Sequence, residues 1–120
     1  MAKVIWHENA VDERQHVLLY GLYEFGEKAV IRLENRFRNY NAYLATNPRM
    51  GAVDEKLTEL YGREIRGITV FKHFRLIYII ETENLQNEIV KILELWDTRA
   101  NPDMLKGSIG QYFPEAESFE

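Results

Sequence analysis

Cysteine is absent from this chain of 120 residues. Without cysteine there is neither a disulfide framework nor a thiolate metal site, and a reducing compartment suits such a sequence. Long apolar runs are also absent, because no window approaches the roughly 18 uncharged apolar residues that a membrane helix needs. The first residues, MAKVIWHENA, lack the basic and apolar regions of a signal peptide. We therefore expect a cytoplasmic protein with no membrane contact.

The sequence motifs of several enzyme classes are also lacking. There is no glycine-rich phosphate loop, no G-x-S-x-G segment and no cysteine nucleophile, so nothing supports nucleotide hydrolysis or acyl transfer. His7 and His16 do not form a metal-ligand spacing with Glu8 or Asp12. We expect neither a cofactor nor a metal.

The composition is that of an ordinary globular domain with an uneven charge. Hydrophobic residues make up 46% and charged residues 28% of the chain, and its length suits one core. The net charge is −4, yet residues 63–75 carry four Lys or Arg and one Asp or Glu. A short basic segment therefore lies in an acidic chain, whose total charge disfavours non-specific binding to nucleic acid.

The first half of the sequence predicts a strand followed by two helices. Lys3 to Trp6 is β-prone and could be an edge or a central strand. Asn9 is a candidate N-cap for a helix from about Ala10 to Phe25, and Gly26 can end this helix in a left-handed conformation. A second helix is expected from about Glu27 to Ala45. Helical spacing gives two apolar stripes, formed by Val11, Leu18, Leu22 and Phe25 and by Val30, Leu33, Phe37, Tyr40 and Leu44. Helices joined by so short a loop form an αα-hairpin, whose stripes a sheet could cover.

The second half predicts strands and leaves one segment ambiguous. Residues 49–62 read as a connection or a short helical turn, and residues 63–68 and 74–81 read as strands, with a turn at Glu83-Asn84. The run EIVKILELW (88–96) has helical spacing but strand length, so either structure fits. In the tail, Met104, Leu105 and Ile109 suffice for one short packed segment, and the last eight residues, FPEAESFE, are expected to be loose.

Three segments carry a resemblance to a known family. They are LATNPRMG (44–51), YGREIRGITVFKHFRLIYIIE (61–81) and ILELWDTRANP (92–102). Together with the order of a strand, a helical hairpin and consecutive strands, they resemble the RelE/ParE superfamily of toxins from bacterial type II toxin–antitoxin modules, which includes plasmid stabilisation proteins. The resemblance covers about residues 4 to 105.

The resemblance implies an α+β fold, with an N-terminal strand, an αα-hairpin and antiparallel strands that form a small sheet packed on the hairpin. It makes EIVKILELW the last central strand, assigns residues 1–105 to a single toxin domain and leaves 106–120 as a C-terminal extension. It also implies two kinds of partner: a cognate antitoxin, bound at the hairpin and sheet edge, and a cellular target. We expect the antitoxin segment to carry Lys or Arg, because the C-terminal half is acidic. The sequence does not indicate the oligomeric state.

The same resemblance implies growth inhibition by cleavage of ribosome-bound mRNA. This metal-independent ribonuclease reaction needs a group that moves the 2′-hydroxyl proton and cations that stabilise the phosphate. His73 is the candidate acid or base, since its ordinary pKa of about 6.5 allows proton transfer near neutral pH. Tyr112 is available as a C-terminal tyrosine. The candidate site residues are Arg63, Arg66, Lys72, His73, Arg75 and Arg99.

Simpler roles and other functions remain open for these residues. Basic residues on strands commonly protect an edge or favour solubility, and Asp97 and Arg99 could pair with each other or cap the turn before Asn101-Pro102. The acidic balance suits a ParE-type toxin that inhibits DNA gyrase without catalysis, or an inactive module whose groove holds a partner peptide.

Overall fold

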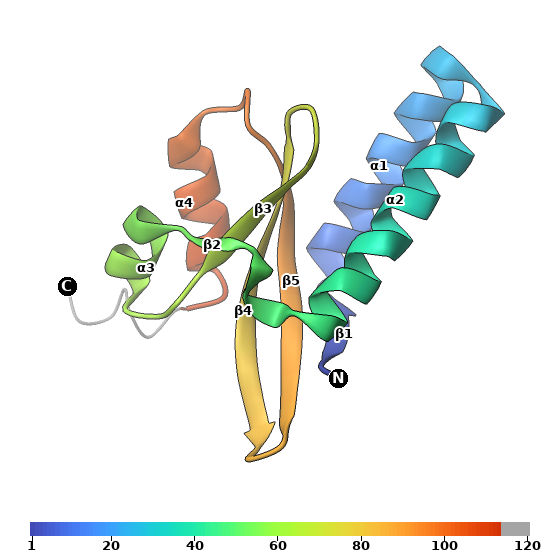
Figure 1. Cartoon of the computed structure of the whole chain (residues 1–120). Coiled ribbons are helices and arrows are strands. Elements are labelled where there is room, and N and C mark those ends of the chain that lie inside the picture. The colour runs from blue at the N-terminus through green and yellow to red at the C-terminus, as the bar shows by residue number, and fades with distance from the viewer. Residues whose placement is uncertain (114–120) are drawn as a thin grey trace.

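The computed structural model describes residues 1–113, which adopt an α+β fold in which one sheet lies between two layers of helices (Figure 1). The αα-hairpin covers one face of the sheet, and two shorter helices cover the other. The elements are β1 (Lys3–Trp6), α1 (Glu8–Phe25), α2 (Glu27–Thr46), the 3₁₀ helix η1 (Pro48–Met50), β2 (Ala52–Val53), α3 (Glu55–Tyr61), β3 (Arg66–Phe71), β4 (Phe74–Asn84), β5 (Asn87–Asp97) and α4 (Pro102–Gly110). No helix in the described part of the chain is long and apolar enough to cross a membrane.

The five strands form a mixed sheet in the order β1-β5-β4-β3-β2. The first strand is an edge strand that pairs in parallel with β5, whereas the other neighbours are antiparallel. Residues 88–96 therefore form a strand, as the family resemblance implied. Ile92 packs into the core below the hairpin and Leu93 into the core on the opposite face. A strand buried on both faces carries a continuous apolar run, which explains why its spacing also suited a helix.

The core between hairpin and sheet confirms the predicted face of the second helix. Phe37 and Leu44 of α2 are buried against Tyr78 of β4 and Ile92 of β5. Trp6 packs edge-on against Phe37, with ring centroids 5.8 Å apart. This core fixes the near end of the hairpin to the sheet.

The first helix ends at Phe25 before Gly26, as predicted, but its N-cap, its exposed C-terminal residues and the conformation of Gly26 differ from the prediction. His7, not Asn9, is the N-cap, and its side chain accepts a hydrogen bond from the Asn9 amide. Leu22 and Phe25 are exposed, because the far end of the hairpin extends away from the sheet (Figure 1). Gly26 alone connects the helices with φ 89° and ψ 179°, a positive-φ conformation that is not the left-handed helical one.

The second core lies on the opposite face, under α3 and α4. It contains Leu57, Ile65, Ile77, Leu93 and Ile109. The expected packed segment of the tail is thus a helix, although Met104 is exposed. This helix crosses position 105, where the expected toxin domain ended. The last eight residues were expected to be loose, and seven of them, 114–120, lie outside the described residues. The eighth, Phe113, packs near Tyr61, with ring centroids 5.6 Å apart.

Strand boundaries also differ from those expected. The third strand begins at Arg66 and not at Arg63, because Ile65 bonds through its backbone to the Asp54 amide and the Thr58 side chain. The β4–β5 turn falls at residues 85–86, because the Asn84 side chain accepts hydrogen bonds from the amides of Gln86 and Asn87. The two-residue strand β2 was not predicted at all.

Candidate functional site

A groove of about 780 Å³ lies between the hairpin and the end of the sheet where β3 turns into β4 and β5 ends. The hairpin diverges from the sheet toward this end of the molecule (Figure 1). The helices contribute His16, Val17, Tyr20, Gly21, Phe25, Ala29, Arg32, Leu33 and Arg36, and the sheet contributes Phe71, Lys72, His73, Phe74, Asp97 and Arg99. The groove is therefore built from segments that are distant in the sequence.

The helical wall presents side chains from successive turns. His16 and Tyr20 are four residues apart on α1, and Arg32 and Arg36 are four residues apart on α2. This spacing places each pair on one face of its helix. Both arginine side chains are exposed, so their charges are available to a ligand in the groove.

The sheet wall begins with a two-residue turn between β3 and β4. Phe71 and Phe74 flank the turn with ring centroids 4.9 Å apart. Lys72 has φ 41°, and it is the one residue other than glycine with positive φ in the described chain. Such a conformation costs a residue with a side chain about 1 kcal/mol or more. The carbonyl of His73 accepts a hydrogen bond from the Thr98 amide at 2.7 Å, which fixes the turn to the segment after β5.

Asp97 and Arg99 form a bidentate ion pair in the same wall. The guanidinium Nε and Nη2 donate to the two carboxylate oxygens at 3.0 and 2.8 Å, and the Arg99 amide adds a third bond at 2.9 Å. These bonds lower the pKa of Asp97 to about 2 and raise the pKa of Arg99. Asn101 is the N-cap of α4 and accepts a bond from the Asp103 amide. The polar end of β5 thus combines a structural cap with groove-lining charges.

The groove is basic although the chain is acidic. Arg32, Arg36, Lys72 and Arg99 contribute four cations, against the single carboxylate of Asp97. Two histidines and four aromatic side chains also line it. Cations interleaved with aromatic rings are the features with which proteins bind nucleic-acid strands.

The structure divides the six predicted site residues into two groups. Lys72, His73 and Arg99 lie together in the groove. Arg63, Arg66 and Arg75 lie elsewhere. Arg63 pairs with Glu81 at 3.2 Å on the other side of the sheet, where its guanidinium carbon lies 5.6 Å from the Phe113 ring.

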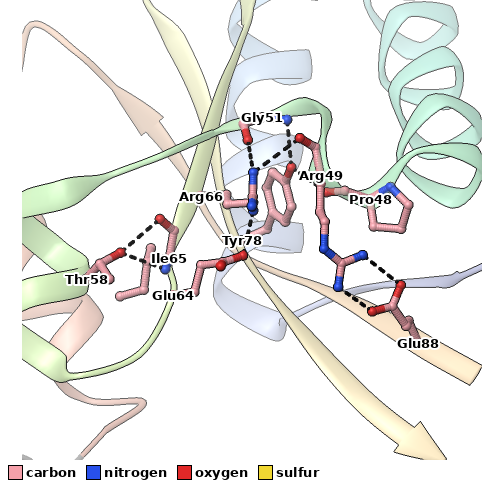
Figure 2. A network of polar contacts seen from close by, with 9 residues as sticks. All are labelled: Pro48, Arg49, Gly51, Thr58, Glu64, Ile65, Arg66, Tyr78 and Glu88. Carbon is pink, nitrogen blue, oxygen red and sulfur yellow. Dashed lines mark hydrogen bonds and ion pairs between the residues drawn. The ribbon is translucent and has the colours of Figure 1, made fainter. Parts of the chain in front are cut away.

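Arg66 is held by neighbouring backbone and side chains, and Arg75 lies against Gly67. Arg66 donates from Nη1 to the carbonyls of Gly51 and Arg49 at 2.7 and 3.2 Å, and from Nε to Glu64 at 2.7 Å (Figure 2). Its side chain is only 15% exposed. Arg75 alternates with Leu76, so it lies on the face opposite the hairpin. There its guanidinium lies so close to Gly67 that a larger residue at that position would clash.

The helical residues of the groove were not predicted. His16, Arg32 and Arg36 have helical spacing, but the sequence does not say which strands end opposite them. Arg32 and Arg36 lie beside the apolar residues of α2 on the same turns as Leu33 and Phe37, and this adjacency was the only available signal.

A second polar cluster lies where β1, α1, β5 and α4 meet. Glu94 of β5 is 3% exposed, and its carboxylate accepts a hydrogen bond from Ser108. Burial and the hydrogen bond and charge of Glu94 raise the pKa of Glu13 to about 9. The Tyr112 hydroxyl bonds to the Leu93 carbonyl, to Asn9 and to His7 at 3.1 to 3.2 Å. Tyr112 is therefore a structural residue of this cluster and does not line the groove.

A scan against models of known protein families finds no match to this chain, and a search of curated proteins finds no significantly similar sequence.

Proposed function

We propose that the protein is the toxin of a type II toxin–antitoxin module and that it inhibits growth by cleaving ribosome-bound mRNA in the basic groove. The observation that carries this proposal is the convergence of His73, Lys72 and Arg99 with His16, Arg32 and Arg36 in one concave site. The order of strand, helical hairpin and antiparallel strands also agrees with the fold of the RelE/ParE superfamily that the sequence resembles.

The proposed reaction is attack of a 2′-hydroxyl on the adjacent phosphorus. The base removes the hydroxyl proton, a new P–O2′ bond forms, and the P–O5′ bond breaks. The products are a 2′,3′-cyclic phosphate and a 5′-hydroxyl, to which an acid returns a proton. Histidine can serve either role near neutral pH, so His73 and His16 are the candidates from the two walls.

The cations of the groove would stabilise the additional charge on the phosphate. Arg99 carries its guanidinium to the groove already oriented by Asp97. The β3–β4 turn places Lys72 in the same groove. Preoriented donors of this kind stabilise developing charge without reorganisation during the reaction.

The test is to induce the protein alone in a bacterial culture and to map new RNA 5′ ends across the transcriptome. We expect new 5′-hydroxyl ends within translated codons. His73→Ala should decrease cleavage by roughly 100-fold or more, the usual contribution of an acid or base. Lys72→Gly removes one cation while relieving the positive-φ strain, so a loss of activity in this variant cannot be ascribed to unfolding.

Matched controls remove charges outside the groove. Arg38 is exposed on α2 and Arg63 pairs with Glu81 on the other side of the sheet. Arg38→Ala and Arg63→Ala should both cleave as the unaltered protein does. Growth arrest without new RNA ends would reject the endonuclease and favour inhibition of DNA gyrase, which the net charge of −4 suits better. Absence of arrest would favour an inactive binding module.

We further propose that the cognate antitoxin packs an amphipathic helix on the opposite side of the hairpin. A shallow apolar groove of about 270 Å³ lies there, lined by Gln15, Leu18, Leu19, Leu22 and Val30. Helix-in-groove binding uses apolar surfaces of this kind. If the antitoxin chain continues into the basic groove, we expect it to carry Asp or Glu there. This differs from the antitoxin segment rich in Lys or Arg that the acidic C-terminal half of the sequence led us to expect.

A further inference from the structure

Two aromatic side chains on the helical wall of the basic groove are largely exposed. Tyr20 is 63% and Phe25 71% exposed. Their ring centroids are 6.4 Å apart, with an angle of 75° between the planes. Large exposed aromatic surfaces are unfavourable in water, and where they gather they commonly mark a binding site. Here both rings line the same groove as the cations.

Cations from both walls line the groove together with the rings. Arg32 and Arg36 share the helical wall with the rings, and Arg99 belongs to the sheet wall. Asp97 chiefly, and Tyr20 to a smaller degree, raise the pKa of Arg99, so the Tyr20 hydroxyl lies near this guanidinium. A ligand that covers the rings would therefore have positive charges on both sides of it.

We propose that the groove binds a single-stranded RNA segment, with unpaired bases stacked on Tyr20 and Phe25 and the flanking phosphates on Arg32, Arg36, Lys72 and Arg99. Every base has a π face, so stacking is available in any unpaired sequence, whereas the bases of a duplex are already stacked on each other. The inference rests on the proposed function, since it names the ligand of the same groove. It adds a base-binding subsite on the hairpin, remote in sequence from the candidate catalytic residue His73.

The test is fluorescence anisotropy with the full chain and a short, unstructured, fluorescein-labelled RNA, compared with the same RNA in a duplex. We expect the single strand to bind more tightly. Tyr20→Ala and Phe25→Ala should each weaken its binding roughly 5- to 100-fold, the usual effect of losing one stacking ring. Tyr20→Phe should retain the affinity, and Tyr20→Leu, which is apolar but cannot stack, should not.

Two residues of the hairpin provide matched controls. Tyr23 is 89% exposed on the same helix as Tyr20 and does not belong to the groove lining, so Tyr23→Ala should leave RNA affinity unchanged. Arg36→Ala should decrease the slope of log affinity against log salt by about 0.7, the value for one phosphate contact on a single strand. Arg38→Ala should not change it. Circular dichroism of each variant checks that the helices are intact.

Each outcome separates this inference from the proposed function. Equal affinity for the duplex, or undiminished affinity in both alanine variants of the rings, would overturn the inference even if cells show RNA cleavage. Binding of poly-glutamate in the groove without binding of RNA would overturn it in favour of an acidic protein ligand. Single-strand binding that depends on the rings supports the inference, and if RNA ends stay unchanged in cells, the endonuclease alone is rejected.

Discussion

Tyr78 shows how a single residue connects the central sheet to the segment after the hairpin. Its side chain is fully buried. The hydroxyl accepts a hydrogen bond from the Gly51 amide at 2.9 Å and donates one to the Pro48 carbonyl at 2.7 Å (Figure 2). Arg66 completes the network by donating to the Gly51 carbonyl. The charge of Arg66 thus satisfies backbone groups, which is a structural role for one of the predicted site residues.

Gly51→Ala should destabilise the fold because no space exists for a β-carbon. An ideal Cβ would lie 2.6 Å from the Tyr78 hydroxyl oxygen and 3.0 Å from the Gly67 carbonyl oxygen. The backbone at Gly51 is ordinary extended chain, so the cost comes from crowding. We expect a loss of about 1–3 kcal/mol in the free energy of unfolding, the usual cost of overpacking, measured by urea denaturation.

A double-mutant cycle with Tyr78→Phe checks the origin of this cost. Tyr78→Phe alone leaves the Gly51 amide and the Pro48 carbonyl without their partner and should cost about 1–3 kcal/mol. The double variant removes both the crowded hydroxyl and its bond, so its cost should fall below the sum of the two single costs. Strict additivity would contradict the proposed clash.

At the scale of single residues, the sequence predicted the sheet side of the groove better than the helical side. The candidates Lys72, His73 and Arg99 could be named because the basic segment and the polar end of β5 are each continuous in the sequence. Arg75 was grouped with them, but strand alternation turns it to the opposite face. Which strand face meets the hairpin depends on packing, and no local pattern reveals it.

At the scale of elements, the far end of the hairpin diverges from the sheet (Figure 1). Val11 and Leu18 lie near the packed part of α1, whereas Leu22 and Phe25, on the same predicted stripe, are exposed. Helical periodicity reveals an apolar face but not how far the neighbouring layer extends. The prediction of two helices was therefore right, whereas Leu22 and Phe25 lack the cover that the sequence led us to expect for the whole stripe.

If the protein is a toxin as proposed, the exposed apolar face of the hairpin predicts that growth inhibition and neutralisation can be separated. Leu19 and Leu22 line the apolar groove and contribute nothing to the basic groove. A Leu19→Asp/Leu22→Asp variant should retain its effect on growth but escape its antitoxin, because charges on this face would remain desolvated under a bound helix. Co-expression with the proposed cognate antitoxin measures this as growth arrest that the antitoxin no longer relieves.

The matched control for this variant lies on the other side of the same helix. Tyr20→Asp alters the basic groove and should decrease toxicity while the partner still binds. If the double variant at Leu19 and Leu22 were still neutralised, the antitoxin would have to bind another surface, such as the edge of the sheet.

At the scale of the whole molecule, a partly buried polar cluster of Glu13, Glu94, Ser108 and Tyr112 joins elements from both faces of the sheet. Glu13 extends from α1 and accepts a hydrogen bond from the Leu95 amide at 3.3 Å, while Ser108 of α4 bonds to Glu94. The cluster thus connects the hairpin, the sheet and the last helix. With its pKa raised to about 9, the Glu13 carboxyl keeps its proton at neutral pH.

This proton makes the stability of the whole fold depend on pH. The pKa of Glu13 is about 4.5 when unperturbed and about 9 in the folded protein, so the folded state holds a proton that the unfolded state releases in this interval. The free energy of unfolding should therefore fall as pH rises from about 4.5 to 9, by at most about 1.4 kcal/mol per pH unit for one proton. Burial and the charge of Glu94 raise the pKa of Tyr112 from 10 to about 12. For the same reason the free energy of unfolding should continue to fall between pH 10 and 12.

Substitution of Glu13 by glutamine tests the assignment, because an amide can replace the protonated carboxyl without titrating. Glu13→Gln should resemble the unaltered protein near pH 5 and be more stable than it near pH 8, in urea denaturation at each pH. Below about pH 4.5 the free energy of unfolding should fall on acidification in both proteins. The reason is that Arg99 and Arg49 hold the pKa values of Asp97 and Glu88 below their ordinary range, and the stability from these ion pairs is lost when the carboxylates are protonated. An unchanged slope between pH 5 and 8 in Glu13→Gln would show that another group carries the proton. If so, the coupling of hairpin, sheet and last helix would rest on packing of the two cores and not on the carboxyl pair.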